Sequence, residues 1–319
     1  MRLGIRLHLN SIILKLLKAE YFCVDLKFRL MIKYNPKSWI ALLFHSYSRQ
    51  TVKMLTPALI SISVYSFILI YLIVDFWEIK FESTTAVHSL LGIVLGLFLV
   101  FRTNSAYDRW WEGRKQWGAL VNNTRNLALK LSAFLPKDDL ENRSYFAQMI
   151  PNFVYSMKEH LREGVVMEEI DVVGENFMDK FEDVDHVPNK ISLLLYEKVN
   201  ELYRSGKLTS DHFFVLDKEL KSFSDILGAC ERIRNTPIPY SYSMYIKKFI
   251  FTYIVTMPLA FIYPFNYWAI PMVLMVFFML MTIELIAEEI EDPFGTDVND
   301  LPTDTLAIKI KANVREILL

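Results

Sequence analysis

The chain has 319 residues, of which 53% are hydrophobic and 14% aromatic, yet 22% are charged. Its mean hydropathy is +0.24, which is on the apolar side for a chain of this length. A chain can be both apolar and highly charged when the two kinds of residue are segregated, so we expect membrane segments joined to a polar region. The formal net charge is −1, whereas proteins that bind nucleic acids are typically basic. The two cysteines, Cys23 and Cys230, do not have the spacing of a zinc site or of a disulfide framework.

Residues 1–30 are basic and contain one short apolar run, Ile12 to Leu17, which is too short to cross a bilayer. No small-residue cleavage site follows this run, so a secretory signal peptide is not expected. An amphipathic surface helix and an extension in front of a second start at Met31 are both open. We therefore expect an N-terminal extension, residues 1–30, followed by a single domain, residues 31–319.

Two apolar segments are predicted to cross the membrane early in the chain. The first, residues 57–77, is interrupted only by hydroxyl groups until Asp75, and its length of about 20 residues suits a bilayer core of about 30 Å. The second, residues 86–101, carries Gly92 and Gly96 on one helical face. Small residues at this spacing allow another helix to approach closely.

The region between the second and third predicted spans, residues 102–245, is charged and helical in its pattern, and it begins with a surplus of Arg and Lys. The third and fourth spans are predicted at residues 249–265 and 269–287, before an acidic turn and tail, residues 288–319. Basic residues flank the first three spans on the same side, so the positive-inside rule places both termini and the long middle region in the cytosol. No alternating strand pattern is present, and the predicted fold class is all-α, with four transmembrane helices.

One face of the second span carries Ile93, Leu97 and Phe101, which are four residues apart. If this face lines a pore, it forms an apolar constriction that gates by losing its water. Packing against lipid or against other helices is the alternative, and spacing alone favours it.

An acidic segment surrounds a Pro-Phe-Gly turn after the fourth span. Its carboxylates include Glu289, Asp292, Asp297 and Asp300. Calcium takes several oxygen ligands from a bending backbone, which this segment offers, although its spacing is not that of an EF-hand. A solvated turn that ends the helix is an equal alternative.

Signatures of enzymes are absent from the sequence: it has no GxSxG, HExxH, P-loop or dinucleotide-binding pattern, so we predict no catalytic residue and no enzyme. The histidines are scattered along the chain, and we expect them to be surface or packing residues. They are His8, His45, His88, His160, His186 and His212.

Three motifs, in order and at matching separations, resemble the bacterial bestrophin family of ion channels. They are FRTNSAYDRWWEGRKQWG after the second span, CERIRNTPIPYSY before the third and AEEIEDPFGTDVNDLP after the fourth. The similarity extends over roughly residues 31–306. It implies a homopentamer around one central ion path, with four transmembrane helices and a large cytosolic helical region in each subunit.

The resemblance also assigns roles to residues. The neck of the family's pore falls on Ile93, Leu97 and Phe101, and a second constriction at the cytosolic end falls on His212 or Phe213. Eukaryotic members bind calcium at the turn that matches the four carboxylates Glu289, Asp292, Asp297 and Asp300. Asp292 and Glu289 replace amides of that pattern, so no cofactor is certain and calcium is the one candidate.

The sequence therefore predicts a bestrophin-like channel in the inner membrane that conducts small monovalent ions passively. The family favours chloride or another anion, and a cation is open because the net charge gives no preference. A secondary transporter is the first alternative, with Glu284 as the main charge inside a span. A membrane scaffold, or a metal-dependent membrane enzyme that uses the acidic turn, is the second.

Overall fold

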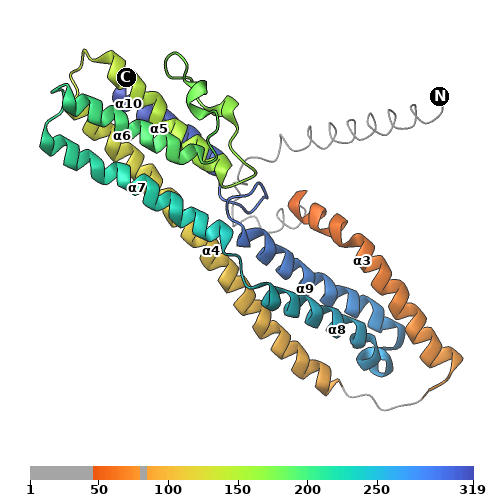
Figure 1. Cartoon of the computed structure of the whole chain (residues 1–319). Coiled ribbons are helices and arrows are strands. Elements are labelled where there is room, and N and C mark those ends of the chain that lie inside the picture. The colour runs from red at the N-terminus through yellow and green to blue at the C-terminus, as the bar shows by residue number, and fades with distance from the viewer. Residues whose placement is uncertain (1–45, 80–84) are drawn as a thin grey trace, which may run out of the picture. The chain divides into compact units, whose positions relative to one another are not determined.

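The structure is a computed structural model, and it describes residues 46–79 and 85–319 (Figure 1). All regular elements in these two ranges are helical, which confirms the predicted all-α fold class. The predicted extension, residues 1–30, lies outside the described residues.

The described residues form two compact units. The first, which we call the membrane unit, comprises residues 46–79, 85–112 and 235–293. The second, the polar unit, comprises residues 113–234 and 294–319. The apolar segments predicted from the sequence fall in the membrane unit, and most of the charged middle region falls in the polar unit.

The membrane unit holds the apolar helices, and within it α8 and α9 form a hairpin that packs beside α3 (Figure 1). Its elements are α3 (Ser46–Tyr71), the π-helical turn η1 (Leu72–Phe76), the first part of α4 (Ala86–Phe134), α8 (Tyr240–Phe265), the 3-10 turn η4 (Asn266–Trp268) and α9 (Ala269–Glu291).

Three helical stretches among the described residues are long and apolar enough to cross a membrane: Gln50–Phe76, Ala86–Phe134 and Tyr240–Glu291. The third stretch contains α8 and α9, and the predicted spans 249–265 and 269–287 lie inside these two helices. The helix that carries the first predicted span, residues 57–77, begins at Ser46 and continues through Pro57.

The helices of the membrane unit share an apolar core. Leu95 and Leu99 of α4 are buried against Ile250 and Ile254 of α8. A Cβ atom added at Gly92 would lie 2.8 Å from the hydroxyl oxygen of Tyr253 on α8, so a larger residue there would require the tyrosine side chain to shift. One of the two glycines predicted to allow close approach, Gly92, therefore lies against another helix, whereas Gly96 contacts no neighbouring helix among the described residues.

The polar unit is a helical bundle with a core that includes stacked rings of Phe153 and Phe223, whose centroids are 4.9 Å apart. Pro136 lies in the break that ends α4, and Pro188 lies in the first turn of α6, as expected for a residue that lacks an amide proton. The further elements are α5 (Leu140–His160), the 3-10 turns η2 (Met167–Glu169) and η3 (Met178–Phe181), α6 (Val187–Arg204), α7 (Ser210–Asn235) and α10 (Thr303–Leu318).

A cluster of ion pairs holds α10 against α5. Asp304, near the start of α10, accepts hydrogen bonds from Lys158 Nζ at 2.8 Å and from Arg162 Nη2 at 2.7 Å. Lys158 is 2% exposed and also pairs with Glu159 and Glu169. Burial alone would raise the pKa of Asp304, but the hydrogen bonds from Arg162 and Lys158 outweigh it and lower the pKa from 3.8 to about 2.

This shift predicts a loss of stability in acid. A carboxyl group with a lowered pKa stabilises the folded state above its unfolded pKa, so the contribution is complete above about pH 4 and disappears as the pH falls toward about 2. Asp304→Asn should remove about 1–3 kcal/mol at pH 7 and flatten this part of the pH profile. Thermal unfolding in detergent, followed by circular dichroism between pH 2 and pH 7, measures both effects.

The control for this prediction is Glu316→Gln, which changes an exposed carboxylate on the same helix. It should leave the acid profile of the wild-type protein unchanged. If the wild-type protein and Asp304→Asn lost stability equally between pH 7 and pH 2, Asp304 would not be the source of the loss in acid.

Candidate pore-lining face

The three predicted neck residues lie on an exposed face of α4. Ile93 is 72% exposed, Leu97 is 56% exposed and Phe101 is 54% exposed in the single chain. With about 100° of rotation per residue, the exposed positions between residues 86 and 101 cover an arc of about 160° that is centred on Leu97. This arc is apolar except for Ser89 at its edge, and we call it the α4 face.

The opposite side of the same helix is packed within the chain. Leu95 is fully buried and Leu99 is 3% exposed, both in the core shared with α8 and α9. A Cβ atom added at Gly96, at the edge of the α4 face, would meet no atom within 4 Å, unlike one added at Gly92. The helix therefore has one side that is packed against its own chain and one apolar side that is not.

A buried ion pair begins where the α4 face ends. Arg102 is 1% exposed, and its Nη2 atom lies 2.6 Å from Glu291 Oε2 at the end of α9. Its Nε atom lies 3.6 Å from Oε1 of Glu284, which is also 1% exposed. Arg102 therefore joins α4 to α9 and is not a free charge at a pore mouth.

Further hydrogen bonds fix the end of α9. The Nε atom of Arg109 donates to the carbonyl oxygen of Glu291 at 3.0 Å, and the amide of Ile238 donates to Glu291 Oε1 at 2.8 Å. Arg109 also donates to the carbonyl oxygen of Thr236. The motif charges after the second span and the Pro-Ile-Pro segment thus meet at one glutamate.

The two residues predicted for the second constriction lie in the first turn of α7, in the polar unit. The ring of His212 stacks on Phe134, with centroids 4.0 Å apart, and the ring of Phe213 packs against Tyr203. Both are partly buried in the chain, while the next residue, Phe214, is 71% exposed. Their role as a constriction stays a prediction.

The four carboxylates of the acidic turn are divided between the units: Glu289 and Asp292 belong to the membrane unit, and Asp297 and Asp300 to the polar unit. The amide of Asp297 donates to Asp300 Oδ2 at 2.6 Å. One carboxylate oxygen therefore holds the turn, which is the structural role that the sequence left open beside calcium binding. Calcium binding stays a prediction.

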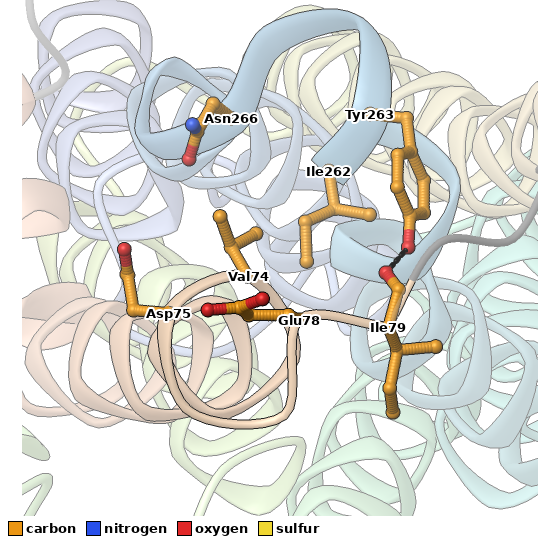
Figure 2. Close-up of a pocket in the computed structure, with 7 residues that line it drawn as sticks. All are labelled: Val74, Asp75, Glu78, Ile79, Ile262, Tyr263 and Asn266. Atoms are coloured by element: carbon orange, nitrogen blue, oxygen red, sulfur yellow. Dashed lines mark hydrogen bonds between the residues drawn. The ribbon is translucent and has the colours of Figure 1, made fainter.

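A cavity of about 420 Å³ lies in the membrane unit where η1 approaches the end of α8 (Figure 2). The hydroxyl group of Tyr263 donates to the carbonyl oxygen of Ile79, and that of Tyr267 donates to Asp75. These bonds tie the end of the first span to the hairpin. The cavity is lined by Val74, Asp75, Glu78, Ile79, Ile262, Tyr263 and Asn266.

The fold and the α4 face define an all-helical membrane protein with an unpartnered apolar helix face. Residues 31–316 match the family described as Bacterial/Fungal Bestrophin protein, and the chain belongs to this family. The match confirms the resemblance that the three motifs predicted.

Relatives and solved structures agree with this assignment. A voltage-dependent anion channel-forming protein of Nostoc sp. is 36% identical, over 71% of this chain and 75% of the relative. Another from Synechocystis sp. is 34% identical, over 77% of this chain and 81% of the relative. A crystal structure of a bacterial bestrophin homologue from Klebsiella pneumoniae superposes with a TM-score of 0.75 and 27% identity, over 82% of this chain and 97% of that one.

The buried ion pair generates a stability prediction. Arg102→Met leaves the carboxylate of Glu284 buried without its cation, so it should destabilise the protein by about 3–5 kcal/mol. The double variant Arg102→Met/Glu284→Met removes the more deeply buried of the two carboxylates that pair with Arg102, while Glu291 keeps the amide of Ile238 as a donor, so it should recover part of this loss. Thermal unfolding midpoints in detergent measure the difference.

The matched control is Lys247→Met, which breaks an ion pair with Glu288 whose side chains are 40% and 54% exposed. An exposed pair contributes roughly 0–1 kcal/mol, so this variant should unfold close to the wild-type temperature. If Arg102→Met and Lys247→Met unfold at the same temperature, the buried pair is not the stabilising contact.

Proposed function

We propose that the chain is one subunit of a passive ion channel whose central pore is lined by the α4 face. The observation that carries the proposal is the exposure of Ile93, Leu97 and Phe101 opposite a fully packed side of the same helix. A single chain encloses no path with one helix face, so several copies must surround the axis. Five copies, as in the bestrophin family, would stack three apolar rings.

The rings form the barrier to ion flow. An ion that enters a narrow apolar ring loses water and gains no ligand in exchange, so the passage is unfavourable until the ring widens or fills with water. The pore needs no covalent chemistry. Monovalent ions lose far less hydration free energy than divalent ions at such a ring, because the cost rises steeply with ionic charge.

The permeant ion is proposed to be an anion. This preference rests on the names of the relatives from Nostoc and Synechocystis, which are described as voltage-dependent anion channel-forming proteins. Near the end of the α4 face, Arg102 and Arg109 lie beside Glu284 and Glu291, so these four residues together add no formal charge of either sign.

We place the channel in the inner membrane, with four spans formed by α3, the first part of α4, α8 and α9. The basic residues that follow Phe101 support a cytosolic position for the polar unit and for both termini. Acidic residues after α9 do not argue against this orientation, because carboxylates have little influence on topology.

A secondary transporter is the second candidate, and the buried Arg102–Glu284 pair is the observation that favours it. Ionisable pairs inside a membrane protein often belong to ion or proton pathways. A transporter would move its substrate only with a coupled ion, whereas a channel carries current down the gradient of a single ion. Flux in liposomes without a coupling gradient separates the two.

The oligomeric state is the first test of the channel. Native mass measurement in detergent should give five subunits. In a background without cysteine, Leu97→Cys should form disulfide-linked dimers under oxidation, because copies of the α4 face meet across the axis. Ile60→Cys, on the 59% exposed outer side of α3, should cross-link far less. A monomer or dimer as the only species would refute the central pore.

Single-channel recording tests the neck itself. Leu97→Ala should widen and wet the ring and raise conductance or open probability at least severalfold, whereas Leu97→Phe should reduce the current. In an asymmetric salt gradient, the reversal potential should lie close to the equilibrium potential of the anion. A reversal potential close to that of the cation would overturn the proposed anion selectivity but not the proposed channel.

Two control variants complete this experiment. Ile60→Ala truncates an exposed apolar side chain on another helix and should leave conductance unchanged. Leu95→Ala, on the packed side of α4, should destabilise the subunit by about 2–5 kcal/mol with no gain in current. Equal currents for Leu97→Ala and Ile60→Ala would count against the pore assignment of the α4 face.

A further inference from the structure

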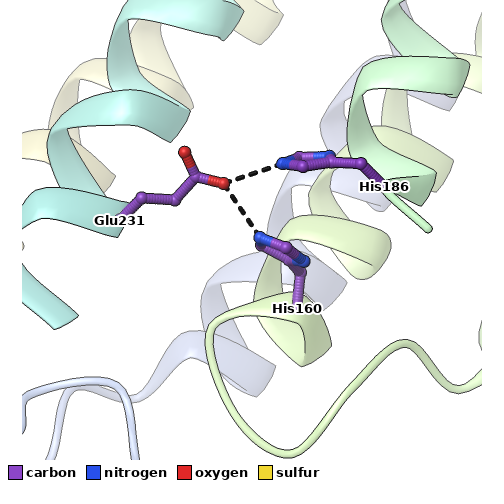
Figure 3. Close-up of side chains that lie close together, drawn as sticks. All are labelled: His160, His186 and Glu231. Carbon is purple, nitrogen blue, oxygen red and sulfur yellow. Dashed lines mark hydrogen bonds and ion pairs between the residues drawn. The ribbon is translucent and has the colours of Figure 1, made fainter. Parts of the chain in front are cut away.

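Three side chains from three helices of the polar unit converge on one point (Figure 3). His160 is the last residue of α5, His186 precedes the first residue of α6 and caps it, and Glu231 lies near the end of α7. They form the one group of three or more His, Cys, Asp or Glu side chains, in the part of the chain that the structure describes, whose ligand atoms all lie within 4.8 Å of one another.

The two imidazole rings contact the same carboxylate oxygen. The Nε2 atoms of His160 and His186 each lie 2.8 Å from Oε1 of Glu231. The ring centroids are 4.4 Å apart, and the ring planes are inclined by 38°. Two nitrogen atoms and a carboxylate oxygen therefore face a common centre, and none of the three groups takes part in the proposed pore.

We propose that His160, His186 and Glu231 bind a divalent transition-metal ion of the zinc type. Imidazole nitrogen and carboxylate oxygen are the ligands that zinc takes beside thiolates, at about 2.0–2.2 Å. A tetrahedral ion at these distances separates its ligand atoms by about 3.3–3.5 Å. The observed 2.8 Å contacts need to open by about half an ångström, which small side-chain rotations provide.

The site is accessible to an ion and keeps an open position. The side chains of His160, His186 and Glu231 are 24%, 34% and 28% exposed, so a hydrated ion can reach them from solvent. Three protein ligands leave the fourth tetrahedral position to water. One negative charge from Glu231 and two neutral imidazoles form a ligand set of His₂Glu composition.

The surrounding contacts hold two of the ligands in place. Arg234, one helical turn after Glu231, donates to the carbonyl oxygens of His160 and Arg162 and so ties the end of α5 to α7. His186 accepts a hydrogen bond at Nδ1 from the amide of Asn189 at 3.3 Å. Without a metal ion, this bond orients the ring so that Nε2 points toward Glu231. Metal binding through Nε2 leaves the ring proton on Nδ1, which can no longer accept, so the long capping bond is lost when the ion binds.

Occupancy would connect three helix ends. The ion would join the end of α5, the start of α6 and α7, and it would close the segment that contains η2 and η3. A ligand that binds only the folded state raises its stability by mass action. The site thus stabilises the polar unit, and it does so whether or not the chain conducts ions.

Zinc binding is measured on the purified full chain in detergent, without a polyhistidine tag and after treatment with a chelator. Titration with zinc against a chromogenic chelator should show one site per chain that is lost in His160→Gln/His186→Gln and weakened at least about 100-fold in Glu231→Gln. Cobalt should give the visible absorption of a tetrahedral site. Zinc should also raise the thermal midpoint of the wild-type protein but not of Glu231→Gln.

The control is His212→Gln, which removes a histidine of the same unit that stacks on Phe134. It should bind zinc as the wild-type protein does. Glu231→Gln preserves the size of the side chain, so it keeps the test decisive if the double histidine variant fails to fold. Absence of zinc binding by the wild-type protein, or equal binding by Glu231→Gln, would overturn the proposal, and neither result bears on the channel.

Discussion

The packing of the membrane unit depends on the point in α4 where an exposed apolar residue, Phe101, is followed by a buried and ion-paired one, Arg102. Phe101 belongs to the exposed apolar face, and the next residue is 1% exposed and bound to Glu291 and Glu284. Adjacent residues of a helix point about 100° apart, so one can face outward while the next enters the core. The ion pair fixes the rotation of α4 against α9, and this rotation decides which apolar residues stay exposed.

The exposed face follows from that fixed rotation. Leu95 and Leu99 pack in the core that α4 shares with α8, and Gly92 allows the hydroxyl group of Tyr253 to approach α4. Ile93 and Leu97 then stay exposed in the single chain. An exposed apolar face of this size would favour aggregation in water, whereas in a membrane it can contact lipid or a second copy of the chain. In the proposed oligomer, a ring of copies would turn this face into a barrier to ions.

Much of this arrangement was visible in the sequence because it is periodic or local. The apolar stretches within α3, α4, α8 and α9 could be recognised from length and composition, and the four-residue spacing of Ile93 and Leu97 placed them on one face. Of the two glycines spaced four residues apart, only Gly92 lies at a close contact within the described part of the chain. The sequence did not show that a helix would continue through Pro57, because a proline inside a helix removes one backbone hydrogen bond and usually marks a helix end.

Contacts between distant residues could not be predicted in the same way. Glu284 was noticeable as a charge within an apolar span, and such a charge needs a partner, but nothing in the sequence identified Arg102, which lies far away along the chain. His160, His186 and Glu231 look like scattered residues because they are separated by long segments. Only the packing of α5, α6 and α7 brings them together, so spacing rules for metal ligands had no pattern to detect.

If the α4 face lines a pore as proposed, the same geometry limits how that pore can select ions. Arg102 and Arg109 lie beside the carboxylates of Glu284 and Glu291, so these two cations already have anionic partners within the chain. Apolar rings without net charge discriminate by the hydration that an ion must give up, which depends on its size and valence more than on its sign. In the proposed oligomer, a preference for anions would therefore arise at the rims of the pore, where each charged residue would occur once per subunit and the potentials of the copies would add. The number of subunits would then affect selectivity, since every added copy would contribute the same rim charge again.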